Sequence, residues 1–212
     1  MYKIYKNFLT QDHAWDLACS IDSNPTNWFE LTLNHDNTNK PLHLPLNISG
    51  YRKIFDNENS IRNTIINGKF AYRFHKTNTH VKGCTCWECE FTKNVLMSKS
   101  FKDLLIKETS LTNPVLKESF TSVYYPKDFL GLHKKDKSGV EFTFHLSWDW
   151  RPEYGGLFHL ENDIGFQTYV PGWGDLLIME VDKNTKKNFV SEVTEYAPRP
   201  RLAISGWFID EE

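Results

Sequence analysis

The chain has few cysteines, little charge imbalance and no long run of apolar residues. Its 212 residues include four cysteines and carry a formal net charge of −2. Surfaces that bind nucleic acid or membranes normally show a clustered basic face. Lysine pairs such as Lys134-Lys135 and Lys186-Lys187 are too short to form one. We therefore expect neither a nucleic-acid partner nor a membrane partner.

Targeting signals are also missing from the sequence. The segment from Met1 to Leu9 lacks the apolar core of about 7–15 residues that a signal peptide carries. No stretch approaches the ~20 consecutive apolar residues of a membrane span. These features predict a cytoplasmic protein whose cysteines are reduced or metal-bound, and not paired in disulfides.

The hydrophobic content of 40% and the aromatic content of 15% are those of a globular protein. The length suits one domain over residues 1–212, and we find no internal repeat, low-complexity segment or linker. Within this domain we expect residues 1–118 to form a helical support with a Cys-rich insertion near residues 75–91. Residues 119–208 are expected to form the barrel core.

The periodicity of apolar residues separates these two parts. Apolar residues between Ala14 and Ile21 recur with the spacing of a helix, and Thr10 is placed to cap that helix. Cys19 lies beside the apolar face of this helix and is expected to be buried in the core. Further helices are predicted over residues 59–67 and 98–109. The stretch from Asn24 to Tyr51 is rich in Asn and Pro and is expected to be mostly loop.

Alternation with a period of two marks the predicted strands. One is expected over residues 69–74, and a series follows over residues 119–125, 141–147, 157–160, 167–170, 175–181, 189–194 and 202–208. Helices followed by many short strands indicate a helix-buttressed β-sandwich or open barrel.

A histidine and an aspartate lie close together in Leu130-Gly-Leu-His-Lys-Lys-Asp136. Non-haem Fe(II) oxygenases hold iron with two histidines and one carboxylate on one face of the metal. In a strand, His-x-Asp projects both side chains to the same side. Two residues separate His133 from Asp136 here, so a bulge or turn is needed to place the Asp136 side chain on the same side as His133.

Six segments between about Phe120 and Phe208 have an order and spacing that resemble the prolyl-4-hydroxylase-like branch of the Fe(II)/2-oxoglutarate dioxygenases. They are Tyr125-Pro-Lys-Asp-Phe-Leu-Gly-Leu-His133, Phe142-Thr-Phe-His-Leu-Ser-Trp-Asp-Trp150, Tyr154-Gly-Gly-Leu-Phe158, Val170-Pro-Gly-Trp-Gly-Asp-Leu-Leu177, Val190-Ser-Glu-Val193 and Arg201-Leu-Ala-Ile-Ser-Gly-Trp-Phe208. The resemblance implies an α+β, mainly β fold. Its core would be a double-stranded β-helix, a jelly-roll or cupin-like barrel buttressed by N-terminal helices.

The resemblance also implies roles for individual residues. His133 takes the place of the first iron ligand, and Asp136 is the nearest carboxylate for the second. Asn188 stands where the family has its second histidine. Arg201 corresponds to the basic residue that pairs with the distal carboxylate of 2-oxoglutarate, a task that suits a planar bidentate fork. His145 and Tyr125 match further residues of the cosubstrate pocket.

By this resemblance the protein would bind Fe(II), 2-oxoglutarate and O₂ and would hydroxylate an unactivated C–H bond. The substrate would be a peptidyl residue, for which the family name favours proline, or an amino acid. An Asn amide is a weak, neutral ligand for Fe(II), so a catalytically degenerate binding protein is the alternative. A third hypothesis is a ligand-binding jelly roll without metal.

The remaining motif is His80-Val-Lys-Gly-Cys84-Thr-Cys86-Trp-Glu-Cys89. Three cysteines and a histidine can supply the four ligands of tetrahedral zinc, although Cys-x-Cys-x-x-Cys is not the common pair of knuckles. His80, Cys84, Cys86 and Cys89 are therefore a candidate structural zinc site. Reduced thiols in a folded insertion, or a disulfide, are the alternatives.

Overall fold

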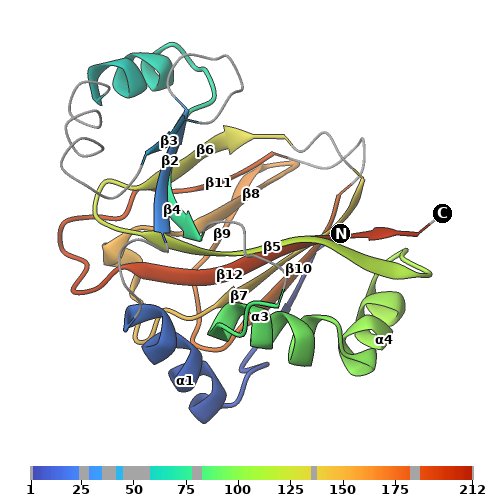
Figure 1. Cartoon of the computed structure of the whole chain (residues 1–212). Coiled ribbons are helices and arrows are strands. Elements are labelled where there is room, and N and C mark those ends of the chain that lie inside the picture. Colours follow the sequence, from blue (N-terminus) through green and yellow to red (C-terminus); the bar gives the residue numbers. More distant parts are fainter. Residues whose placement is uncertain are drawn as a thin grey trace.

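The computed structural model describes residues 2–23, 58–77, 83–134, 138–181 and 187–211, together with the backbone of residues 29–34 and 42–44. Its strands form a curled, mainly antiparallel sheet whose two halves lie over one another. Helices cover the outer face of one half (Figure 1). In the described part of the chain no helix is both long and apolar enough to cross a membrane.

The larger half contains the neighbouring strands β1 (Tyr2–Tyr5), β10 (Leu176–Val181), β7 (Gly139–His145), β12 (Arg201–Asp210), β5 (Pro114–Tyr124) and β4 (Tyr72–Thr77). The smaller half continues from β4 with β6 (Phe129–His133), β11 (Asn188–Val190), β8 (Phe158–Asn162) and β9 (Gly165–Tyr169). Strand β2 (Phe29–Asn34) pairs with β4 and with β3 (Leu42–Leu44). Strands from the first 118 residues thus enter the same sheet as the later ones.

Three helical segments pack under the larger half. Helix α1 (Gln11–Asp22) begins at Thr10, whose side chain accepts a hydrogen bond from the backbone N–H of His13. Helix α3 (Trp87–Phe91) runs on into a π-helical turn, η2 (Thr92–Leu96), and α4 (Lys99–Glu108) follows. Residues 58–66 are also helical but lie over the opposite side of the sheet, and a short 3₁₀ turn, η3, covers Pro152–Tyr154 (Figure 1).

The main core lies between these helices and the sheet. Phe142, Phe144 and Phe208 project from the sheet and are fully buried, and Phe101 of α4 packs edge-on or tilted against all three. Burying each such ring contributes roughly 1.5–3 kcal/mol, so this cluster is a major source of stability for the helix–sheet interface.

The predicted fold class is confirmed: the sheet has the mainly β, double-stranded β-helix form with buttressing helices. The strands over residues 119–208 and the helices near residues 11–22 and 99–108 lie close to their predicted positions. One expectation was wrong: Cys19 is exposed on α1, because it lies on the side away from Ala14 and Leu17. Within the segment from Asn24 to Tyr51, which was expected to be mostly loop, the described residues are those of β2 and β3.

Candidate active site

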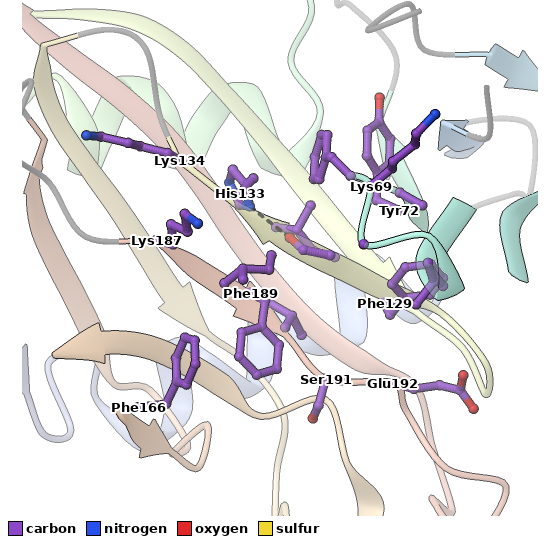
Figure 2. A pocket seen from close by; sticks show the side chains of 18 residues that line it. Lys69, Tyr72, Phe129, His133, Lys134, Phe166, Lys187, Phe189, Ser191 and Glu192 are labelled. Atoms are coloured by element: carbon purple, nitrogen blue, oxygen red, sulfur yellow. Dashed lines mark hydrogen bonds between the residues drawn. The ribbon is translucent and has the colours of Figure 1, made fainter. Parts of the chain in front are cut away.

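Two adjoining cavities lie on the inner side of the smaller half of the sheet. The inner one, of about 360 Å³, lies between the two halves of the sheet, and the outer one is an open groove of about 1120 Å³ (Figure 2). The residues that line both are Phe70, Tyr72, Leu130, His133 and Val190. His133 therefore stands where the inner cavity opens into the groove.

Arg201 is a buried charged residue of the inner cavity, which Lys76, Glu118 and Glu141 also line. It begins β12, is only 3% exposed, and stands opposite Tyr124 in the β5–β12 pair. Its guanidinium carbon lies 5.0 Å from the centroid of the Tyr124 ring, and its Nε has no hydrogen-bond partner. No carboxylate of the described residues forms an ion pair with it. Burial lowers the pKa of Arg201 from its usual value, against the opposing effects of Tyr124 and Tyr169.

A buried cation without a paired anion is costly, because desolvation is not compensated. The guanidinium fork matches the two oxygens of a carboxylate. The inner cavity is therefore suited to an anionic ligand that places a carboxylate against Arg201.

His145 is the second polar group of the cavity. It ends β7, is 1% exposed, and neither ring nitrogen has a hydrogen-bond partner. Its pKa is lowered well below the usual value, first by burial and then by the positive charges of Arg201 and Lys6. The neutral ring offers one donor and one acceptor. A ligand held by Arg201 can accept a hydrogen bond from this ring.

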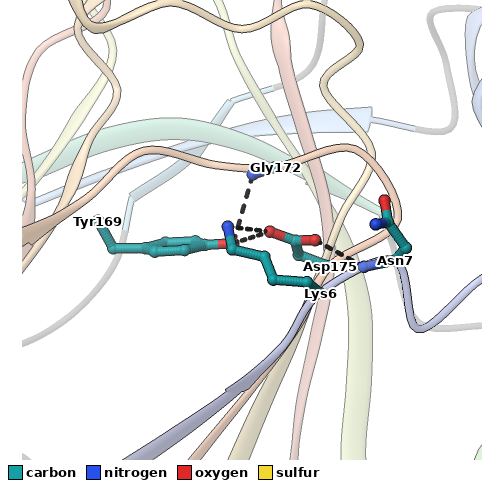
Figure 3. Close-up of polar contacts among 5 residues, drawn as sticks. All are labelled: Lys6, Asn7, Tyr169, Gly172 and Asp175. Carbon is teal, nitrogen blue, oxygen red and sulfur yellow. Dashed lines mark hydrogen bonds and ion pairs between the residues drawn. The ribbon is translucent and has the colours of Figure 1, made fainter.

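A buried acid holds the segment on which His145 lies. Asp175 accepts a hydrogen bond from the Tyr169 hydroxyl, another from Lys6 Nζ at 2.7 Å and a third from the Asn7 backbone N–H at 2.9 Å (Figure 3). The Tyr169 ring in turn packs against the His145 ring, with 5.2 Å between their centroids.

The backbone around Asp175 also holds His145 directly. The Asp175 carbonyl accepts the His145 N–H, and Gly174 N–H donates to the His145 carbonyl, each at 2.9 Å. Our sequence analysis missed Asp175 and Tyr169. Asp175 lies in the segment Val170-Pro-Gly-Trp-Gly-Asp-Leu-Leu177, which carried part of the family resemblance, but no role was assigned to it.

His133 and Asn188 face one another across the β6–β11 pair. Their Cα atoms are register partners, and both side chains line the inner cavity. His133 Nδ1 lies 3.0 Å from the carbonyl oxygen of Gly131, which can only accept, so Nδ1 is the donor in this contact and the contact orients the ring. Asn188 is 2% exposed and its amide nitrogen has no partner. Asp136 lies outside the described residues.

The described residues therefore fit the two implied groups unequally. The orphaned atoms of Arg201 and His145 fit 2-oxoglutarate, because they match a carboxylate with a cationic fork and a neutral donor. At the position expected for iron, the described residues offer the His133 imidazole and the Asn188 carboxamide, which are both neutral ligands, whereas such iron sites also use a carboxylate.

Tyr125 does not line the inner cavity; Tyr124 does. Tyr125 is 45% exposed, and its ring packs edge-on against His75 with 4.8 Å between centroids. Adjacent residues of a strand point to opposite faces, so an error of one residue moves the side chain out of the cavity. Burial raises the pKa of Tyr124, which keeps its hydroxyl protonated beside Arg201.

The outer groove combines aromatic walls with basic residues. Phe166 and Phe189 project into it from β9 and β11, and Lys69, Lys134 and Lys187 stand around it (Figure 2). Glu192 is the one acidic lining residue among those described. The described lining of the groove is thus largely aromatic and apolar, with more basic than acidic side chains.

Comparison with known proteins agrees with this arrangement. Residues 119–209 match the model of the 2OG-Fe(II) oxygenase superfamily. No curated protein sequence matches the chain. Among solved structures, a prolyl-4-hydroxylase from Pseudomonas putida aligns with a TM-score of 0.56 at 14% identity, over 99% of this chain and 92% of that one.

Two further structures align over nearly the whole chain. An oxidoreductase of the 2OG-Fe(II) oxygenase family from Burkholderia pseudomallei gives a TM-score of 0.60 at 8% identity, over 98% of this chain and 84% of its own. A viral collagen prolyl hydroxylase from Paramecium Bursaria Chlorella virus-1, solved with 2OG, gives 0.55 at 10% identity, over 98% and 94%. Residues 119–209 thus resemble the 2OG-Fe(II) oxygenase superfamily, and the chain has the fold seen in these prolyl hydroxylase structures.

Proposed function

We propose that the inner cavity binds 2-oxoglutarate, with the distal carboxylate on Arg201 and the His145 ring donating a hydrogen bond to it. The observation that carries this proposal is the buried guanidinium of Arg201, which has no anion among the described residues. A dicarboxylate neutralises that charge and satisfies its orphaned donor, whereas a neutral ligand leaves both costs in place.

We further propose that His133, Asp136 and Asn188 hold Fe(II) at the mouth of the inner cavity. When bound, iron with 2-oxoglutarate and O₂ supplies the oxidising chemistry that converts a C–H bond to C–OH, with release of succinate and CO₂. The contribution of His133 is an imidazole oriented by its contact with Gly131. Asn188 adds a carboxamide oxygen from the opposite strand. Aromatic side chains that line the inner cavity, among them Phe70, Phe74 and Tyr124, would reduce access of water to the site.

The substrate in this proposal is a peptidyl residue rather than a free amino acid. The outer groove is open, and its volume of about 1120 Å³ exceeds what a single amino acid fills. His133 lies where this groove meets the inner cavity, so a residue in the groove reaches the metal position. Proline remains the favoured residue by resemblance to the family alone.

Turnover is tested by measuring succinate release from 2-oxoglutarate with Fe(II), ascorbate and a pool of proline-containing peptides. We expect release that requires Fe(II) and is abolished by Arg201→Met. Iron-independent binding of 2-oxoglutarate without any turnover would instead support the second candidate, a degenerate binding protein. The observation that favours this second candidate is Asn188 at the position of a histidine ligand.

A further inference from the structure

Three cysteine sulfurs converge at a place outside both cavities. The Sγ atoms of Cys84, Cys86 and Cys89 all lie within 4.8 Å of one another, and none of the three forms a disulfide. None of them lines the inner cavity or the outer groove. Among the residues that the structure describes, no other group of three His, Cys, Asp or Glu side chains is close enough to hold a metal ion.

Local backbone geometry produces this convergence. Cys86 is the N-cap residue of α3, and Cys89 lies three positions on, so their side chains share one side of the first turn. Cys84 follows Gly83, whose φ of +85° turns the chain back towards the helix start. The Cys-x-Cys-x-x-Cys spacing therefore gathers all three thiols without help from a distant segment.

A buried glutamate fixes the same turn to the barrel. Glu88, between Cys86 and Cys89, is 2% exposed. Its Oε2 accepts hydrogen bonds from the Thr77 hydroxyl at 2.7 Å, from the Thr121 hydroxyl at 2.8 Å and from the Thr121 N–H at 3.1 Å. The cysteines are thus held at a defined position against β4 and β5, two strands that line the inner cavity.

We propose that Cys84, Cys86 and Cys89 bind a structural Zn²⁺ ion. Tetrahedral zinc with Zn–S bonds of about 2.3 Å separates its sulfurs by about 3.8 Å, so closing the cluster needs shifts of roughly 1 Å or less. Binding exchanges three thiol protons for one Zn²⁺ and releases those protons to solvent. Soft thiolate ligands suit zinc and disfavour magnesium and calcium, which prefer oxygen ligands.

The ion has a structural task in this position. It would join the start of α3 to the turn before it. The hydrogen bonds of Glu88 to Thr77 and Thr121 would hold this joined segment against β4 and β5. Because zinc binds the folded arrangement and not the separated thiols, its binding free energy adds to the stability of the fold. This proposal does not depend on the oxygenase activity.

The test is metal analysis of the full chain purified without a metal-binding tag, followed by Co²⁺ substitution. We expect about one zinc per chain, and intense thiolate-to-cobalt charge-transfer bands after exchange. Cys86→Ser and Cys89→Ser should lose both signals. Cys19→Ser, which removes the exposed cysteine of α1, is the matched control and should keep them. His133→Ala should also keep them, which separates this ion from any metal at the oxygenase site.

The wild-type chain alone can overturn the proposal, so it does not depend on whether the variants fold. Folded wild-type protein that contains no zinc and gives no charge-transfer band with Co²⁺ would contradict it. Titration of fewer than four thiols in the unfolded, non-reduced chain would show a disulfide in place of the ion, and would contradict it equally.

Discussion

The guanidinium carbon of Arg201 lies 5.0 Å from the centroid of the Tyr124 ring, and Arg201 forms no ion pair with a carboxylate of the described residues. The aromatic face partly compensates for the charge, by about 0.5–2 kcal/mol, while leaving the donors of the fork for a ligand. The pair therefore orients a cation in a cavity without neutralising it. This arrangement is typical of an arginine that binds a ligand, whereas a structural arginine is usually paired with a carboxylate of the protein.

Replacing this arginine should abolish cosubstrate binding without unfolding the protein. Arg201→Met removes a bidentate, charge-assisted contact, so we expect 2-oxoglutarate affinity to fall at least about 100-fold. Removing an unpaired buried charge should leave the melting temperature unchanged or higher. Arg199→Met is the matched control, since Arg199 stacks on Trp148 instead. Calorimetric titration measures the 2-oxoglutarate affinity of both variants. Equal affinities in Arg201→Met and Arg199→Met would contradict the assignment.

His145 should make stability depend on pH. The pKa of His145 in the folded state lies below the ordinary 6.5. As the pH falls below 6.5, His145 therefore binds a proton in the unfolded chain but not in the folded chain. This difference destabilises the fold by up to about 1.4 kcal/mol per pH unit below that point, and has no effect above it.

Urea unfolding of wild type and His145→Gln between pH 5 and 8 measures the effect. The variant should lose less stability than wild type on acidification, whereas His13→Gln on exposed α1 should follow wild type. Identical pH slopes for wild type and His145→Gln would show that His145 is not held neutral.

Asp175 should stabilise the fold and position His145 at the same time. Asp175→Asn removes the charge that accepts hydrogen bonds from Tyr169, Lys6 and the Asn7 N–H inside the protein, so we expect a loss of about 2–4 kcal/mol. Lys6→Met removes a largely exposed partner and should cost less than about 1 kcal/mol. Chemical denaturation distinguishes the two. A cost for Asp175→Asn as small as that of Lys6→Met would contradict the account.

Asn188 should limit metal affinity. Asn188→His supplies a second imidazole opposite His133, and we expect Fe(II) affinity to rise about tenfold or more. Asn188→Ala removes the carboxamide and should weaken Fe(II) binding if its oxygen is a ligand. Equilibrium dialysis under argon measures each affinity. An unchanged affinity in both variants would exclude position 188 from the iron site.

Much of the barrel could be predicted from the sequence because its strands alternate clearly and are separated by Gly-containing turns. The strands β2 and β3 could not, since their pairing with β4 is a tertiary contact that a weakly periodic, Asn-rich segment does not reveal. Arg201, His145, His133 and Asn188 line one cavity, as the resemblance implied.

Tyr125, which the resemblance placed in the cosubstrate pocket, lies outside the inner cavity, whereas Tyr72 and Tyr124 line it. Sequence comparison does not resolve the face to which adjacent residues point. The network of Asp175, Tyr169 and Lys6 was missed because it joins β1, β9 and the turn before β10, which are far apart in the chain.

The most direct test of the central claim is an anaerobic titration of the metal-free protein with Fe(II) and 2-oxoglutarate, followed by the metal-to-ligand charge-transfer band of the chelated cosubstrate. The account predicts a band that saturates at one equivalent of each, is lost in Arg201→Met and persists in Arg199→Met. A folded wild-type protein that gives no band at saturating concentrations of both would contradict it.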